Sequence, residues 1–134
     1  MAAILKEEYE ALAAFRRRIR QFLRFSEDAA RAAGLTPQQH QALLAIKGCP
    51  GREHVTISEL AECLHIRHQS AVGLADRLSI NKFARRRPDP ADRRRVHLLL
   101  TARGRKALEA LSAAHREQLS RIGPEIVSLL KHLT

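Results

Sequence analysis

The residues with the most distinctive chemistry form an arginine-rich stretch at 85–95, which reads RRRPDPADRRR. Two arginine triplets flank the segment 88–92, whose prolines fix φ and whose aspartates can bond the local backbone, so this segment is predicted to turn. The run VHLLL at 96–100 is typical of a strand. The two triplets are therefore predicted to lie on opposite arms of one β-hairpin, where their guanidinium groups would bind the phosphates of a polyanion.

The sequence contains no arrangement typical of an enzyme. It has no phosphate-binding glycine loop, no serine elbow and no pair of cysteines at metal-ligand spacing. His65 and His68 stand three residues apart, but the neighbouring Ile66 and Arg67 favour a polar surface role over a metal site. We therefore predict that the protein is not an enzyme and that it uses no metal and no cofactor.

A lone two-stranded hairpin is marginal in water, so other elements must support it. A capping box of Thr56 and Glu59 predicts a short helix directly upstream. After a short break, a second helix is predicted from about His68 to Asn81. Its apolar face comprises Ala71, Leu74, Ala75 and Leu78. A helix, a turn, a helix and a basic hairpin in this order are the layout of a winged helix-turn-helix.

Two segments carry a resemblance to a known family. The segment LHIRHQSAVGLADRL at 64–78 and the segment RRRPDPADRRRVHLLLTARG at 85–104 resemble the DNA-binding core of the MarR family of bacterial transcription regulators. The Asp-Arg-Arg at 92–94, the Leu-Thr at 100–101 and Gly104 match that family's wing and its exit. The resemblance extends in outline to both flanks. It implies a mainly α fold with a small β-hairpin wing, in which N- and C-terminal dimerisation helices flank a winged helix-turn-helix.

The chain is predicted to form a single domain, 1–134, with the winged helix-turn-helix core at about 36–100. Long helical segments are expected at about 4–33 and 102–133, the second of them interrupted and restarted at 123–125. These flanking segments hold more apolar surface than the core can cover, and in the resembling family they interlock between two subunits. We therefore expect a homodimer that binds a palindromic DNA operator, with reading helices about 34–36 Å apart.

Local signals define where several of these elements begin and end. Gly34 is typical of a helix C-terminus. Thr36 followed by Pro37 combines a cap with a proline at the first helical position. The pair at 55–56 is expected to add a short third strand, and Thr101 is expected to cap the last helical segment.

The composition favours a nucleic-acid partner. The chain carries 24 basic and 14 acidic residues, a formal net charge of +10, and the wing stretch 85–95 supplies a large part of it. A basic module for RNA or for an anionic surface is the alternative reading of this charge. That reading does not explain the order helix, turn, helix, hairpin. An aromatic content of 4% also leaves few rings for stacking on single-stranded bases.

Two cysteines, Cys49 and Cys63, occur without a signal peptide or an apolar run long enough to span a membrane. This pattern predicts a cytoplasmic protein with reduced thiols and no membrane partner. Cys63 is expected in the core because it falls on the apolar side of its short helix. Cys49, in a loop, is the better candidate for oxidation.

The candidate DNA contacts divide by role. Gln69 and Ser70, with His68 beside them, are expected to meet base edges in the major groove. The resemblance places Arg94 in the minor groove and implies that Asp92 pairs with an arginine to hold the wing tip. The other candidates are expected to contact phosphates. The full set is Ser58, Arg67, His68, Gln69, Ser70, Arg77, Arg86, Arg87, Asp92, Arg93, Arg94 and Arg95.

The resemblance also implies how the protein is regulated. Members of the family often bind small anionic or aromatic molecules between the reading domain and the dimerisation helices, and this binding weakens their hold on DNA. The expected function is therefore a sequence-specific, double-stranded DNA-binding transcription regulator, a repressor that a small-molecule effector releases. The candidate effector pocket comprises Phe15, Arg16, Ile19, His40 and Leu44.

Three positions depart from the family's pattern. Arg67 stands where many relatives carry a serine or aspartate cap, so the reading helix lacks an obvious N-cap. Gly73 stands where a side chain often reaches DNA, and a glycine there costs the helix roughly 1 kcal/mol relative to alanine. Asn81 lies near a position where glycine is common, and it is expected to adopt the left-handed turn.

Overall fold

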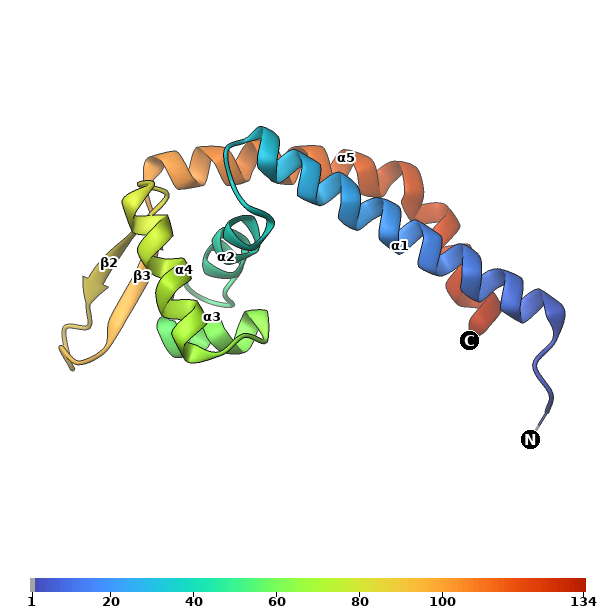
Figure 1. Ribbon diagram of the computed structural model, residues 1–134, viewed down its shortest axis with the longest axis horizontal. Coiled ribbons are helices and arrows are strands. Elements are labelled where there is room, and N and C mark those ends of the chain that lie inside the picture. The colour runs from blue at the N-terminus through green and yellow to red at the C-terminus, as the bar shows by residue number, and fades with distance from the viewer. Residues whose placement is uncertain (1) are drawn as a thin grey trace.

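The computed structural model describes residues 2–134, which form five helices and one three-stranded antiparallel sheet (Figure 1). In chain order the elements are α1 (Lys6–Ala32), α2 (Pro37–Lys47), β1 (His54–Thr56), α3 (Ile57–Leu64), α4 (His68–Ile80), β2 (Ala84–Pro88), β3 (Val96–Leu100) and α5 (Ala102–Leu133). The predicted mainly α fold with a small hairpin wing is confirmed.

Two capping boxes set the starts of α2 and α3. Thr36 Oγ1 accepts the Gln39 amide at 3.1 Å, and the Gln39 side chain accepts the Thr36 amide at 2.9 Å. Thr56 and Glu59 exchange the same two bonds at 3.2 and 2.9 Å. Both boxes satisfy amides that the first helical turn leaves without a partner. The predicted starts are therefore confirmed, and the position of α3 relative to β1 follows from the second box.

The sheet supports the hairpin on one side. Its strand order is β1-β3-β2, with Val55 opposite Leu98 and Arg87 opposite His97. The short third strand expected at 55–56 is therefore confirmed as β1. Because β1 pairs along β3, the hairpin is no longer an isolated ribbon, and its base is fixed to the body of the protein.

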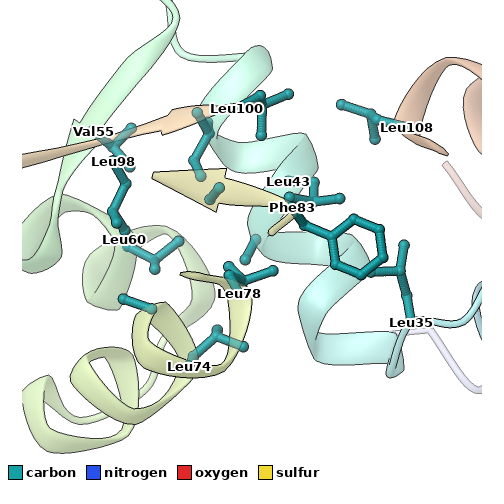
Figure 2. Packing of buried hydrophobic residues seen from close by; sticks show 14 of the residues in the cluster. Leu35, Leu43, Val55, Leu60, Leu74, Leu78, Phe83, Leu98, Leu100 and Leu108 are labelled. Atoms are coloured by element: carbon teal, nitrogen blue, oxygen red, sulfur yellow. The ribbon is translucent and has the colours of Figure 1, made fainter. Parts of the chain in front are cut away.

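The core lies between α2, α3, α4, the sheet and the first turns of α5. Figure 2 shows Leu43, Leu60, Leu74, Leu78 and Leu98 converging there, and all five are fully buried. The four apolar residues predicted for the inner face of α4 are all at 0% exposure. Their burial fixes the rotation of α4, so its opposite face is directed away from the protein.

The flanking helices α1 and α5 run side by side and extend away from the core (Figure 1). The structure corrects the expected break at 123–125, because α5 continues through Pro124 to Leu133. A proline normally clashes with the Cβ of the preceding helical residue, but that residue is Gly123. Packing on α1 and an ion pair from Arg18 to Glu125 at 2.6 Å support the helix on both sides of the proline.

Left-handed residues end three of the helices, and His65, with φ +54°, is the one that follows α3. Gly34, with φ +82°, follows α1 as predicted. After α4 the left-handed residue is Lys82, with φ +64°, whereas Asn81 has φ −81°, so the expectation for Asn81 was wrong by one position. The amides of Lys82 and Phe83 bond back to Ser79 and Leu78, and this closing motif places the left-handed residue after the cap rather than at it.

One of the two cysteines differs from its expected environment, whereas Cys49 lies in the loop after α2 as expected. Cys63 is exposed, because the buried stripe of α3 runs through Leu60 and Ala61. Cys63 lies about a quarter turn around the helix from that stripe. Cys49 is half-buried and packs against the core. The expected core role of Cys63 was therefore wrong. No helix within residues 2–134 has the length and apolar character needed to cross a membrane.

Candidate nucleic-acid interface

Helix α4, the reading helix, presents a polar outer face. His68, Gln69, Ser70 and Arg77 are all exposed on it. The helix starts after Arg67, whose side chain makes no capping bond, as the sequence predicted. The first-turn amides of α4 therefore point outward without a side-chain partner, which suits the approach of a phosphate.

The wing comprises β2, a tip at 89–95, and β3. The first arginine triplet lies within β2, whereas the second lies in the tip just before β3, and all six arginines are exposed. Asp89 orders the tip because its Oδ1 accepts the amides of Ala91 and Asp92 at 2.8 and 3.2 Å. The backbone amide of Asp89 donates a hydrogen bond of 2.9 Å to the carbonyl oxygen of Arg95, and this bond closes the turn. The positive charge is thus held on an ordered support.

A relay of hydrogen-bonded side chains that the sequence did not predict, buried at its centre and half-buried at both ends, connects the tip to the sheet. His97, only 7% exposed, donates from Nε2 to Asp89 Oδ2 at 2.8 Å. Its other ring nitrogen, Nδ1, lies 3.1 Å from Nδ1 of His54 on β1. A carboxylate only accepts, so neutral His97 carries its proton on Nε2 and accepts the proton of His54. The chain Asp89–His97–His54 therefore ties the wing tip to β3 and, through β3, to β1.

The relay shifts the acid–base properties of its ends. Two hydrogen bonds, first the one from His97 and then the one from the Ala91 backbone amide, lower the pKa of Asp89 to about 2 from an ordinary value of 3.8. At the other end, burial lowers the pKa of His54, and the neighbouring His97 and Arg52 lower it further. Asp89 therefore stays ionised and able to accept at any pH near neutrality.

We predict that the order of the wing tip is lost in acid. Because the folded pKa of Asp89 is depressed, its contribution is complete above pH 4 and disappears as the pH falls from about 4 to about 2. Asp89→Ala should produce the same effect at neutral pH. Faster amide exchange at 91–95 in this variant, with the exchange of α2 unchanged, is the expected result. Equal protection of the tip in the variant and the parent would contradict it.

Asp92 holds the arginine at the apex. Its Oδ1 accepts both the backbone amide and Nε of Arg94 at 3.1 Å, and the Arg94 side chain is 90% exposed. A hydrogen bond from the Arg94 side chain, and after it one from the Arg94 backbone amide, lower the pKa of Asp92. The pairing of Asp92 with an arginine, which the resemblance implied, is therefore present, and it leaves most of the Arg94 side chain projecting into solvent.

A further ion pair joins the wing to the reading helix. Arg86 on β2 lies 2.5 Å from Asp76, which is exposed on the outer face of α4. One of the predicted phosphate contacts is therefore engaged within the chain. The pair fixes the distance between two elements that the sequence could assign only separately.

Three elements converge at a cleft of about 250 Å³. Ser58 comes from α3, His68 from the start of α4, and Arg94 and Arg95 from the wing tip. The remaining lining residues are Thr56, Ile57 and Val96. The structure thus brings four of the predicted contact residues to one place, with two guanidinium groups beside two helix starts. This arrangement favours a negatively charged group in the cleft.

The five residues proposed for an effector pocket are not gathered in one cavity. Leu44 lines a cleft of about 440 Å³ between α2 and α5, together with Lys47, Arg105 and Leu108. His40 is buried instead, and burial and the nearby His115 lower its pKa. The other three proposed residues, Phe15, Arg16 and Ile19, lie on α1 and do not line this cleft. Among residues 2–134, no cluster of three metal-ligating side chains occurs.

A helix-turn-helix whose outer helix lies beside a basic two-stranded wing defines the winged helix-turn-helix class of proteins. A sequence model described as the MarR family matches residues 33–95, which span α2 to the wing tip. Residues 33–95 therefore form a winged helix-turn-helix that matches the MarR family.

Several solved structures share the fold over nearly the whole chain. AbsC, a MarR family transcriptional regulator from Streptomyces coelicolor, is 19% identical with a TM-score of 0.72, covering 90% of this chain and 81% of AbsC. YusO from Bacillus subtilis is 19% identical with a TM-score of 0.74, covering 98% and 100%. A mutant of S. aureus MepR bound to an oligodeoxyribonucleotide is 19% identical with a TM-score of 0.71, covering 91% and 96%. No curated protein sequence matches significantly.

Proposed function

We propose that the protein is a sequence-specific regulator of transcription that binds double-stranded DNA. The observation that carries this proposal is the convergence of Ser58, His68, Arg94 and Arg95 beside the exposed outer face of α4. In this arrangement α4 enters the major groove, where Gln69 and Ser70 meet base edges, and the wing follows the adjacent backbone and minor groove. The solved complex of MepR with an oligodeoxyribonucleotide supports the same partner class.

In this proposal the predicted contact residues differ in the part of the DNA that they bind. Ser58 and Arg77 bind phosphates beside the reading helix, and Arg67 and His68 do so at its start. On the wing, Arg94 enters the minor groove, and the other arginines position the protein without reading sequence. Those wing positions are Arg86, Arg87, Arg93 and Arg95. Arg86 exchanges Asp76 for a phosphate only if their ion pair opens.

The proposed assembly is a homodimer on a palindromic operator. Large apolar side chains remain exposed along both flanking helices, including Leu12 and Leu23 on α1 and Val127 and Leu130 on α5, each between 42% and 51% exposed. A two-fold partner would cover this surface and would present a second reading helix about 34–36 Å away. We retain 1–134 as one unit, with the reading core at about 36–100.

The proposed mode of control is repression relieved by an effector. The α2–α5 cleft lies where the reading core joins the long helices, and its lining includes the apolar Leu44 and Leu108. Its charged lining residues are Lys47, Arg105 and Glu109, and Lys47 already pairs with Glu53. A molecule seated there would alter the angle between core and flanking helices, and with it the spacing of the reading helices.

The two reading elements are separable by mutation. Arg94→Ala should weaken binding about tenfold, with the largest loss at sites that have A·T-rich flanks, because minor-groove recognition depends largely on width. Gln69→Ala should cost about 1–3 kcal/mol at the preferred site and relax preference at one position per half-site. Sequencing the bound fraction of a randomised duplex pool measures both effects. Arg31→Ala removes an exposed arginine from α1 and is the charge-matched control.

Binding of Arg94→Ala at the parent's affinity would mean that the wing is only a solvated loop. Circular dichroism and sedimentation should show the parent's helix content and assembly in both variants, since neither side chain is in the core.

A further inference from the structure

Gly73 lies at the centre of the outer face of the reading helix. Gln69 precedes it by one turn and Arg77 follows it by one turn, and both of these residues are exposed. The inner face of α4 is fully buried, so the rotation of the helix leaves Gly73 directed away from the protein. Glycine in a helix interior lowers stability relative to alanine, so its presence here requires a reason.

At the glycines outside helix interiors, the conformation or the close contacts of the chain explain why the residue is glycine. Gly34 and Gly51 have φ values of +82° and +77°, a conformation that other residues rarely adopt. At Gly48, which ends α2, an added Cβ would lie 2.9 Å from the Leu44 carbonyl oxygen. Each of these glycines is therefore required by the backbone around it.

The two glycines inside α5 are also explained within the chain. A Cβ at Gly104 would lie 2.0 Å from the carbonyl oxygen of Phe83, so the close approach of α5 to the end of α4 demands glycine there. An added Cβ at Gly123 would meet no atom within 4 Å outside its chain neighbours, but Gly123 precedes Pro124, and a proline disfavours helical geometry in the residue before it partly through that residue's Cβ.

Gly73 has no comparable reason inside the chain. An added Cβ would meet only the terminal nitrogen of the flexible Arg77 side chain, at 3.5 Å, which is an ordinary contact. The residue has regular helical geometry, without a positive φ. The fold accepts alanine at this position and would gain stability from it, so the constraint that selects glycine lies outside the protein.

We propose that Gly73 is a close-approach position, at which the backbone of α4 contacts a base-pair edge in the major groove and a Cβ would hold the helix away. This inference rests on the proposed function. Glycine permits a ligand to approach the backbone directly. The notch at Gly73 sets the depth at which α4 enters the groove, and therefore the reach of Gln69 toward its base. Gly73 is thus a specificity-determining residue that acts without a side chain.

The test is whether one variant shows two opposite effects, a gain in thermal stability and a loss of DNA affinity. Gly73→Ala should raise the melting temperature by roughly 3–6 °C. It should also weaken binding by about tenfold or more to a duplex that the parent selects from a randomised pool. Gly73→Leu, which keeps a high helix propensity, should weaken binding further, because the loss follows the size of the side chain. A loss equal for alanine and leucine would show that helix flexibility, not close approach, is at stake, and would overturn the proposal.

Ser79→Ala is the matched control on the same helix. The Ser79 hydroxyl is buried and has no hydrogen-bond partner among the described residues, so its removal should also raise the melting temperature. Because Ser79 does not lie on the outer face, affinity for the selected duplex should be unchanged. Gly73→Ala that is stabilised and binds as tightly as the parent overturns the inference. A parent that selects no duplex overturns the proposed function instead, so the two failures are distinct.

Discussion

Raising the salt concentration from 50 to 200 mM should weaken binding to duplex DNA by a factor of about 10³ or more. The wing places six exposed arginines on one hairpin, and the start of α4 adds Arg67 and His68. With two such surfaces on one operator, the logarithm of affinity should fall against the logarithm of salt with a slope of magnitude about 6 or more, at about 0.9 per neutralised phosphate. Fluorescence anisotropy with a labelled duplex, repeated at several salt concentrations, measures this slope directly.

The same titration separates duplex DNA from the alternative partners. Single-stranded RNA and anionic vesicles, used as competitors at moderate salt, should displace the duplex poorly. We expect this result because a helix beside a wing is a duplex-binding layout and the chain has few aromatic rings for stacking on single-stranded bases. A nearly flat salt dependence would remove duplex DNA as the natural partner. Efficient displacement by RNA would favour the basic interaction module.

Deleting 123–134 should convert the protein into monomers or aggregates. The deletion removes the part of α5 that carries the exposed Val127 and Leu130, and it breaks the ion pair between Arg18 and Glu125. A monomer carries only one reading helix, so the second half-site is no longer bound by a linked helix. Operator affinity should therefore fall by about 10²-fold or more. Sedimentation velocity measures the assembly, and an intact, soluble dimer after the deletion would count against the proposed interface.

A point variant tests the same surface without shortening the chain. Val127→Glu places a charge among the exposed apolar side chains and should dissociate the dimer, whereas Ser128→Glu adds the same charge at the next exposed residue. Because neither residue is buried within the single chain, both variants should keep their helix content. Equal dissociation by the two variants would indicate general charge repulsion rather than a specific apolar contact.

The elements that could be predicted from the sequence are those specified by short-range chemistry. The capping boxes at Thr36 and Thr56 act within three residues, and the four buried residues of α4 follow from helical periodicity alone. The wing could be placed because its prolines, aspartates and arginine triplets are contiguous. The order of the elements followed from these local signals, and the resemblance added the pairing of Asp92 with an arginine.

The features that escaped prediction depend on contacts between distant parts of the chain. The Asp89–His97–His54 relay requires the register of three strands, which no local pattern fixes. Cys63 was misplaced because eight residues of α3 define the buried stripe too loosely to decide a residue at its border. The predicted break at 123–125 followed a sound rule for proline, but the preceding glycine and the support of α1 outweigh it.

The continuity of α5 gives the molecule a mechanical lever. The helix starts at Ala102, directly after Thr101, and continues to Leu133, so one continuous helix connects the wing to the far end of the protein. Along a contour of about 48 Å, a tilt of about 5° corresponds to a displacement of about 4 Å. We expect small angular adjustments among the long helices to move the wing by a distance close to the rise of one base pair.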